Sequence, residues 1–106
     1  MKNEFIIVLV TAKDRTQGKR IAKGLLKDKL IACANIVGGI ESIFLWKGKI
    51  DSAKEVLLIL KTKKSLFNRV ADKVKSLHSY ETPEIIAMPI LAGEQKYLQW
   101  IKESVC

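Results

Sequence analysis

The chain has 106 residues, of which 48% are apolar, and its 19 Lys and Arg against 11 Asp and Glu give a net charge of +8. This length and apolar content suit a single domain with its own core, and no apolar run reaches the roughly 20 residues of a membrane span. The first residues lack a small-residue cleavage site and the two cysteines lie far apart, so we expect no signal peptide, no membrane contact and an intracellular location.

The basic residues are almost all Lys and are spread along the chain. A nucleic-acid surface more often uses Arg for phosphates and base edges. The pattern therefore favours a solvated, Lys-rich surface, and we expect no nucleic-acid partner.

The first half of the chain predicts a strand, a helix and a long hairpin. The apolar run Phe5 to Val10 is typical of a strand covered on both faces. Asp14 offers an N-cap with Gln17 as its capping-box partner, which predicts a helix over 14–29. Strands over 31–46 and 49–61 follow.

The two hairpin strands are long for so small a domain. Gly38-Gly39 predicts a bulge in the first of them, and Lys47-Gly48-Lys49 predicts the tight turn between them. The hairpin should extend past the helices that cover the sheet. Its exposed end would need a partner, because bare strand edges invite pairing.

The second half predicts a helix from Ser65 to Ser79, a strand over 84–91 and a last helix after Gly93. Pro89 favours an edge position or a bulge for that strand. The last helix should bury one face, formed by Tyr97, Leu98, Ile101 and Val105. The order β-α-β-β-α-β-α predicts one α+β domain over 1–106, a ferredoxin-like four-stranded antiparallel sheet with an extra C-terminal helix.

Proteins with this fold have several different functions, so the function must be inferred from the side chains that are present. The third strand has no aromatic residue for stacking RNA bases, and the loop from Thr11 to Asp14 lacks the Cys-x-x-Cys of a soft-metal carrier. Neither a phosphate loop nor a nucleophile motif is present.

His78 is the one His, and Tyr80, Glu81 and Glu84 follow it closely. Such a group can bind copper(II) or zinc, whereas the alternative is a helix-end His that contacts the last carbonyls. Cys33 should be a buried filler, and the terminal cysteine should be exposed.

Two tryptophans, Trp46 and Trp100, should pack in the core or against a neighbouring subunit. The alternative is that they form an aromatic wall of a pocket between subunits.

Five stretches, which follow in order along essentially the whole chain, together carry a specific signal. They are Lys29 to Ile36, Ser42 to Ile50, Glu55 to Thr62, His78 to Ile85 and Tyr97 to Ile101. In them the chain resembles the CutA family of divalent-cation tolerance proteins. The resemblance implies a non-enzymatic, cytoplasmic homotrimer whose hairpins join sheets across subunits, and which binds copper(II) and other divalent metal ions. A PII-like signalling trimer that binds a small anionic ligand between subunits, or a scaffold trimer, is the alternative.

The resemblance also implies a metal site made of a Cys at the end of the first strand and a His pair at the end of the second helix. Val10 and Leu77 occupy two of these positions, and only His78 matches. His78 is therefore the metal ligand that the resemblance implies, with weak copper(II) binding that a carboxylate from a neighbouring subunit could complete.

Overall fold

The structure is a computed structural model that describes residues 4–106, so the first three residues of the predicted domain lie outside it. Its elements follow the predicted order. They are β1 (Phe5–Ala12), α1 (Arg15–Lys27), β2 (Cys33–Trp46), β3 (Lys49–Lys63), a 3-10 turn (Lys64–Leu66), α2 (Phe67–Leu77), β4 (Ile85–Pro89) and α3 (Gln95–Ser104). No helix among the described residues is both long and apolar enough to cross a bilayer.

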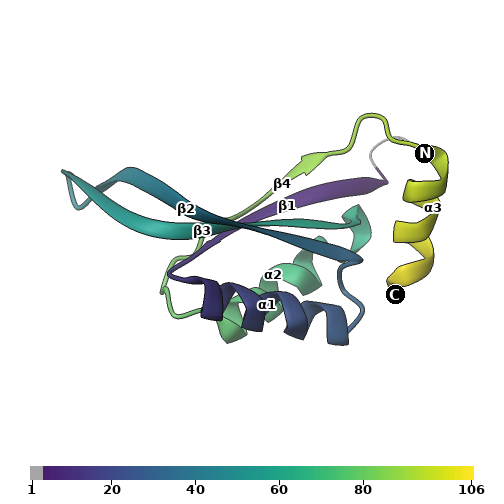
Figure 1. Cartoon of the computed structure of the whole chain (residues 1–106), viewed down its shortest axis with the longest axis horizontal. Coiled ribbons are helices and arrows are strands. Elements are labelled where there is room, and N and C mark those ends of the chain that lie inside the picture. Colours follow the sequence, from purple (N-terminus) through teal and green to yellow (C-terminus); the bar gives the residue numbers. More distant parts are fainter. Residues whose placement is uncertain (1–3) are drawn as a thin grey trace.

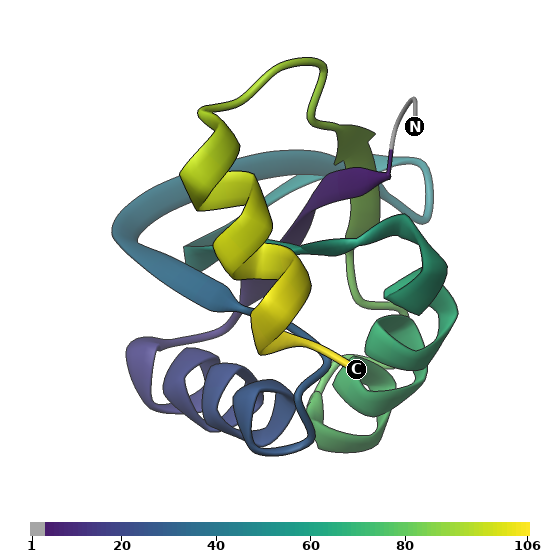
Figure 2. The same cartoon turned by 90° about the vertical axis from the view of Figure 1, so that its right-hand side faces the viewer.

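The four strands form one antiparallel sheet in the order β2-β3-β1-β4, which confirms the ferredoxin-like prediction. Helices α1 and α2 cover one face of the sheet, and α3 lies at the end opposite the hairpin tip (Figure 1). Figure 2 shows α3 crossing that end of the molecule. Strand β4 is at an edge, as Pro89 predicts, since an edge position does not require its missing N–H.

The core lies between the sheet and helices α1 and α2. Strands β1 and β3 supply its centre, and Ile21, Leu25, Val70 and Val74 pack onto it from the helices. The predicted coverage of β1 on both faces is wrong for the single chain. Every second residue of β1 is buried, whereas Ile7 and Leu9 on the opposite face are only half-buried. The run is apolar because the second face of the strand is also apolar, although α1 and α2 cover only the first.

The second face of the sheet carries apolar residues from all four strands. Cross-strand register places these side chains on one surface, because directly paired residues share a face. The surface, which we call the open face, is formed by Ile7, Leu9, Val37, Leu57, Ile59, Ile86 and Met88. Val37, Ile86 and Met88 are more than two-fifths exposed.

The hairpin extends well beyond the helices (Figure 1). Lys47 and Gly48 have φ values of +51° and +77°, which is the left-handed pair that a two-residue hairpin turn with native twist requires. A bulge between Val37 and Ile40 confirms the irregularity predicted at Gly38-Gly39. The projection makes the molecule 44 Å long, with a radius of gyration of 14.2 Å, where about 13 Å is usual for a compact chain of this length.

The helix ends differ in detail from the predictions. Asp14 caps α1 by accepting from the Gln17 N–H at 2.8 Å, but Gln17 accepts from the N–H of Lys13 instead of that of Asp14. The predicted cap at Ser65 is wrong, because Ser65 lies inside the 3-10 turn and α2 has no side-chain cap. In α3, Ile101 is buried, while Tyr97 is 43% exposed and does not face the core.

Candidate functional site

His78 is the first residue after α2 and links the helix layer to the sheet. Its Nε2 lies 2.7 Å from the carbonyl oxygen of Thr11 at the end of β1, and its Nδ1 accepts from the Tyr80 N–H at 3.0 Å. The carbonyl that contacts His78 therefore belongs to β1. The alternative drawn from the sequence, in which His78 contacts the last carbonyls of its own helix, is wrong in this detail. The imidazole fixes where the segment 78–84 leaves the helix.

These two hydrogen bonds determine the tautomer of His78. Nδ1 must keep its lone pair to accept from Tyr80, so Nε2 carries the proton that is donated to Thr11. No nitrogen lone pair is left for a metal ion. Residues 4–106 also hold no group of three or more His, Cys, Asp and Glu that could bind one. The single folded chain does not fit a metal at His78, and a metal there would require one of the two bonds to break.

The other two positions of the implied metal site are apolar and packed. Val10 is fully buried in the core, and Leu77, at the end of α2, is partly buried and packs against this core cluster. The carboxylates near His78 in sequence also lie elsewhere, since Glu81 and Glu84 line a different cavity from His78. Metal binding by His78 stays a prediction.

Tyr80 and Glu55 form a second polar group close by. The Tyr80 hydroxyl donates to Glu55 Oε2 at 2.8 Å, and Glu55 is only 8% exposed. Burial and, next, the hydrogen bond to this carboxylate raise the pKa of Tyr80 to about 12. The phenol is thus held as a neutral donor to a buried carboxylate.

A cavity of about 850 Å³ adjoins this pair, between the hairpin and the segment that joins α2 to β4. The hairpin side carries Phe44, Trp46, Asp51 and Glu55, and the segment supplies Tyr80 together with two further glutamates. Trp46 is 52% exposed and lines this cavity, and Trp100 is 44% exposed. Neither tryptophan packs in the core of the chain.

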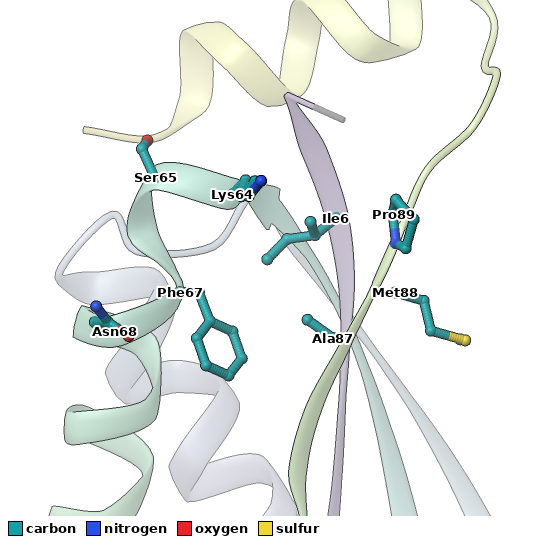
Figure 3. Close-up of a pocket in the computed structure, with 8 residues that line it drawn as sticks. All are labelled: Ile6, Lys64, Ser65, Phe67, Asn68, Ala87, Met88 and Pro89. Atoms are coloured by element: carbon teal, nitrogen blue, oxygen red, sulfur yellow. The ribbon is translucent and has the colours of Figure 1, made fainter. Parts of the chain in front are cut away.

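A smaller cavity of about 510 Å³ lies between α2 and strands β1 and β4. Figure 3 shows the ring of Phe67 turned toward Ala87 of β4, whereas the side chain of Met88 points to the other side of the strand. Its one ionisable lining residue is Lys64, so it offers little chemistry.

The cysteines provide no catalytic arrangement. Cys33 is half-buried where a buried filler was predicted, with its Sγ 4.0 Å from Lys61 Nζ, and Cys106 is exposed as predicted. The site to explain is therefore the Tyr80–Glu55 cavity, which the sequence reading did not identify. The sequence points to Tyr80, Glu81 and Glu84 only as neighbours of His78 and to Trp46 as an alternative pocket wall, and it does not single out Glu55.

Comparisons with known proteins agree with this fold. The family model of the CutA1 divalent ion tolerance protein matches residues 6–104. The chain is 48% identical over 99 residues to the chloroplastic Protein CutA of Arabidopsis thaliana, with 93% of the chain covered but only 54% of the relative. It is 41% identical over 98 residues to the divalent-cation tolerance protein CutA of Thermus thermophilus, with 92% and 95% covered.

The solved structures give the same result. The crystal structure of CutA1 from Oryza sativa superposes with a TM-score of 0.95 at 45% identity, covering 99% of this chain and 96% of that one. A structure from Archaeoglobus fulgidus, described as periplasmic, superposes with a TM-score of 0.93 at 45% identity, covering 96% and 99%. Since relatives are named chloroplastic and periplasmic, the cytoplasmic location stays a prediction. The family match and these relatives establish that the chain belongs to the CutA family of divalent-cation tolerance proteins.

Proposed function

We propose that the chain acts as a non-enzymatic homotrimer in divalent-cation tolerance and that the trimer binds copper(II) weakly. The relatives of full matching length from Thermus and Archaeoglobus carry the name divalent-cation tolerance protein. The proposal supposes one domain over 1–106. Its assembly part rests on the apolar surfaces of the single chain, and its metal part rests on His78.

The homotrimer part of the proposal is supported by the open face together with the projecting hairpin. The open face is continuous across four strands, and Ile43, Leu45 and Ile50 on the projecting hairpin are 69 to 78% exposed. Exposed apolar surface of this extent marks an interface. Strands β2 and β4 also present the two outer edges of the sheet, which further copies of the chain could pair with.

The assembly is tested by light scattering at micromolar concentration. The wild type should have three times the 11.9 kDa mass of the chain. Leu45→Glu places a charge in the proposed interface and should shift the mass toward that of the monomer. Lys47→Glu, at the hairpin turn, is the matched control and should remain trimeric. A monomeric wild type would refute the proposal.

The metal part uses His78. Copper(II) must displace either the Thr11 carbonyl or the Tyr80 N–H from the imidazole, so its affinity should be low. The remaining ligands must come from another subunit. Calorimetry in a Cys106→Ser background removes the exposed thiol as a competing ligand. His78→Ala should then abolish copper(II) binding, and unchanged binding would show that His78 is not the ligand.

A further inference from the structure

The positive charges of the chain are spread along the sequence but not over the folded surface. Helices α1 and α2 with their flanks, residues 13–29 and 64–78, contain 11 Lys and Arg and three Asp. The remaining residues contain eight charges of each sign, so these two helical segments, the basic layer, carry the whole net charge of +8. Charge of one sign concentrated on one surface attracts a partner of the opposite sign.

The acidic residues of the basic layer do little to neutralise it. Asp14 caps α1 by accepting from the Gln17 N–H, and Asp28 forms an ion pair with Lys73 at 3.1 Å. The other ion pair found within residues 4–106 joins Lys102 to Glu4, outside the layer. In that part of the chain, no carboxylate oxygen lies within 4.0 Å of the other ten basic side chains of the layer. Their charges are therefore available to an external anion.

The outer ridge of α1 is the most regular part of the basic layer. It is formed by Lys19, Lys23 and Lys27, which are all exposed. The three residues are four positions apart, so they follow one side of the helix at intervals of about 6 Å.

This ridge lies away from the surfaces proposed for assembly. Helices α1 and α2 cover the face of the sheet opposite the open face (Figure 1). The proposed subunit contacts use the open face, the hairpin and the edge strands β2 and β4, and the ridge belongs to none of them. Arg15 is set aside, because its guanidinium lies close to Gly38 of β2. The ridge thus stays accessible in a trimer built through those contacts.

The spacing of the ridge matches that of an extended peptide. Every second side chain of an extended peptide lies on the same face, about 6.7 Å from the next. Carboxylates at alternate positions of such a peptide can therefore each meet one of the three ammonium groups.

Other anionic partners fit the ridge less well. Its charges are all Lys, whereas phosphate and nucleic-acid recognition favours the Arg fork. Helix α1 has no aromatic residue on which a base could stack. Helices α1 and α2 also bury their apolar faces in the core, so neither presents an apolar face to a lipid surface.

We therefore propose that the ridge of α1 binds an extended acidic segment of a partner protein, with carboxylates at alternate positions. This partner goes beyond the metal ions and the further copies of the chain in the proposed function.

Fluorescence anisotropy on the full chain tests the proposal with a labelled peptide of alternating Glu and Ser. The same peptide with Gln in place of Glu is the uncharged control. The acidic peptide should bind and the Gln peptide should not. Binding should weaken as the salt concentration rises from about 10 to about 150 mM, because exposed charges are screened.

Two triple variants with the same net charge locate the binding surface. Lys19→Gln, Lys23→Gln and Lys27→Gln together keep good helix formers on α1 and should weaken binding of the acidic peptide about tenfold. Lys47→Gln, Lys96→Gln and Lys102→Gln remove three charges outside the layer and should leave the affinity nearly unchanged.

Four results would overturn the proposal. They are no binding of the acidic peptide, equal binding of the two peptides, an equal loss of affinity in the two triple variants, and tighter binding of a single-stranded RNA or of phosphatidylserine vesicles at equal charge. Light scattering on the same samples shows whether the trimer is intact. An intact trimer that binds copper(II) but not the acidic peptide would reject this inference alone.

Discussion

The hydrogen bond between Tyr80 and Glu55 gives the sharpest test of how the site is built. Tyr80→Phe removes one oxygen and leaves the ring in place. It also leaves the Glu55 carboxylate, 8% exposed, without the donor that lies 2.8 Å from it. Because the acceptor that loses its donor is a mostly buried carboxylate, the mutation should cost more than the loss of an ordinary exposed hydrogen bond.

The expected cost is about 2 kcal/mol per chain, since hydrogen bonds to charged groups contribute about 1.5–3 kcal/mol. With a denaturant slope near 3 kcal/mol/M in guanidinium chloride, the unfolding midpoint should fall by about 0.7 M. All variants are compared at one protein concentration, because the stability of an oligomer depends on concentration.

Glu55→Gln supplies the matched control, because its amide oxygen still accepts from Tyr80 without a buried charge. In that background Tyr80→Phe should cost only about 1 kcal/mol, the contribution of a neutral hydrogen bond. The reasoning is refuted if Tyr80→Phe costs less than about 0.5 kcal/mol, or if its cost is the same with Gln at position 55.

The pH dependence of this difference follows from the raised pKa of Tyr80. The phenol binds its proton more tightly in the folded chain, so the advantage of the wild type over Tyr80→Phe is full below pH 10. It should be lost as the pH rises through about 12. An advantage that disappears already below pH 10 would contradict the assigned hydrogen bond.

Three further predictions use thermal unfolding and absorbance. Gly48→Ala places a Cβ at φ +77° and should destabilise the chain by about 1–2 kcal/mol; an unchanged melting temperature would contradict the turn. Thr62→Val removes a buried hydroxyl that donates to the Leu30 carbonyl at 2.6 Å and should cost about 1–3 kcal/mol, whereas a neutral effect would show that this carbonyl has another donor. Burial raises the pKa of both Tyr80 and Tyr97, so absorbance near 295 nm should show less than half of the phenols ionised at pH 10; half or more would refute at least one of the two shifts.

The hairpin and the order of elements could be predicted because their signals are local. The apolar stretch from Ile43 to Trp46 and the later apolar run from Val56 to Leu60 flank a Gly-containing turn, which predicts a hairpin, and both turn residues have the left-handed φ values that a two-residue hairpin turn requires. The coverage of β1 could not be predicted in the same way. An unbroken apolar run shows that both faces avoid water, but it does not show whether a helix or another copy of the chain covers the second face.

The prediction at Ser65 failed for a different reason. A Ser before an apolar periodic run is a good N-cap signal, but here the N–H of Lys64 bonds to the carbonyl of Glu4 at 2.8 Å. That long-range bond extends the pairing of β1 with β3 to Lys64, and the 3-10 turn that begins there includes Ser65. A contact between residues 60 positions apart leaves no trace in a local pattern.

The same limit explains why the sequence pointed to His78 and not to Glu55. His78 is the one His of the chain and invites attention, whereas Glu55 is one of many acidic residues within a β-strand. Its role depends on burial on the sheet and on Tyr80, which is 25 positions away. The nearest available signal was the absence of Lys and Arg from the segment 76–86, which would have suggested an acidic surface on a basic chain.

The segment after α2 connects His78 to the Tyr80–Glu55 pair. The effects of substitutions at these three positions on copper(II) binding must therefore be compared with one another. His78 holds the Tyr80 N–H, and Tyr80 in turn donates to Glu55 in the cavity. His78→Ala therefore releases Tyr80 as well as removing an imidazole. If copper(II) binds at His78 alone, His78→Ala should lose copper while Tyr80→Phe keeps it. If loss of copper in His78→Ala is instead shared by Tyr80→Phe and Glu55→Gln, the metal is bound by the carboxylates of the cavity and the imidazole only positions them.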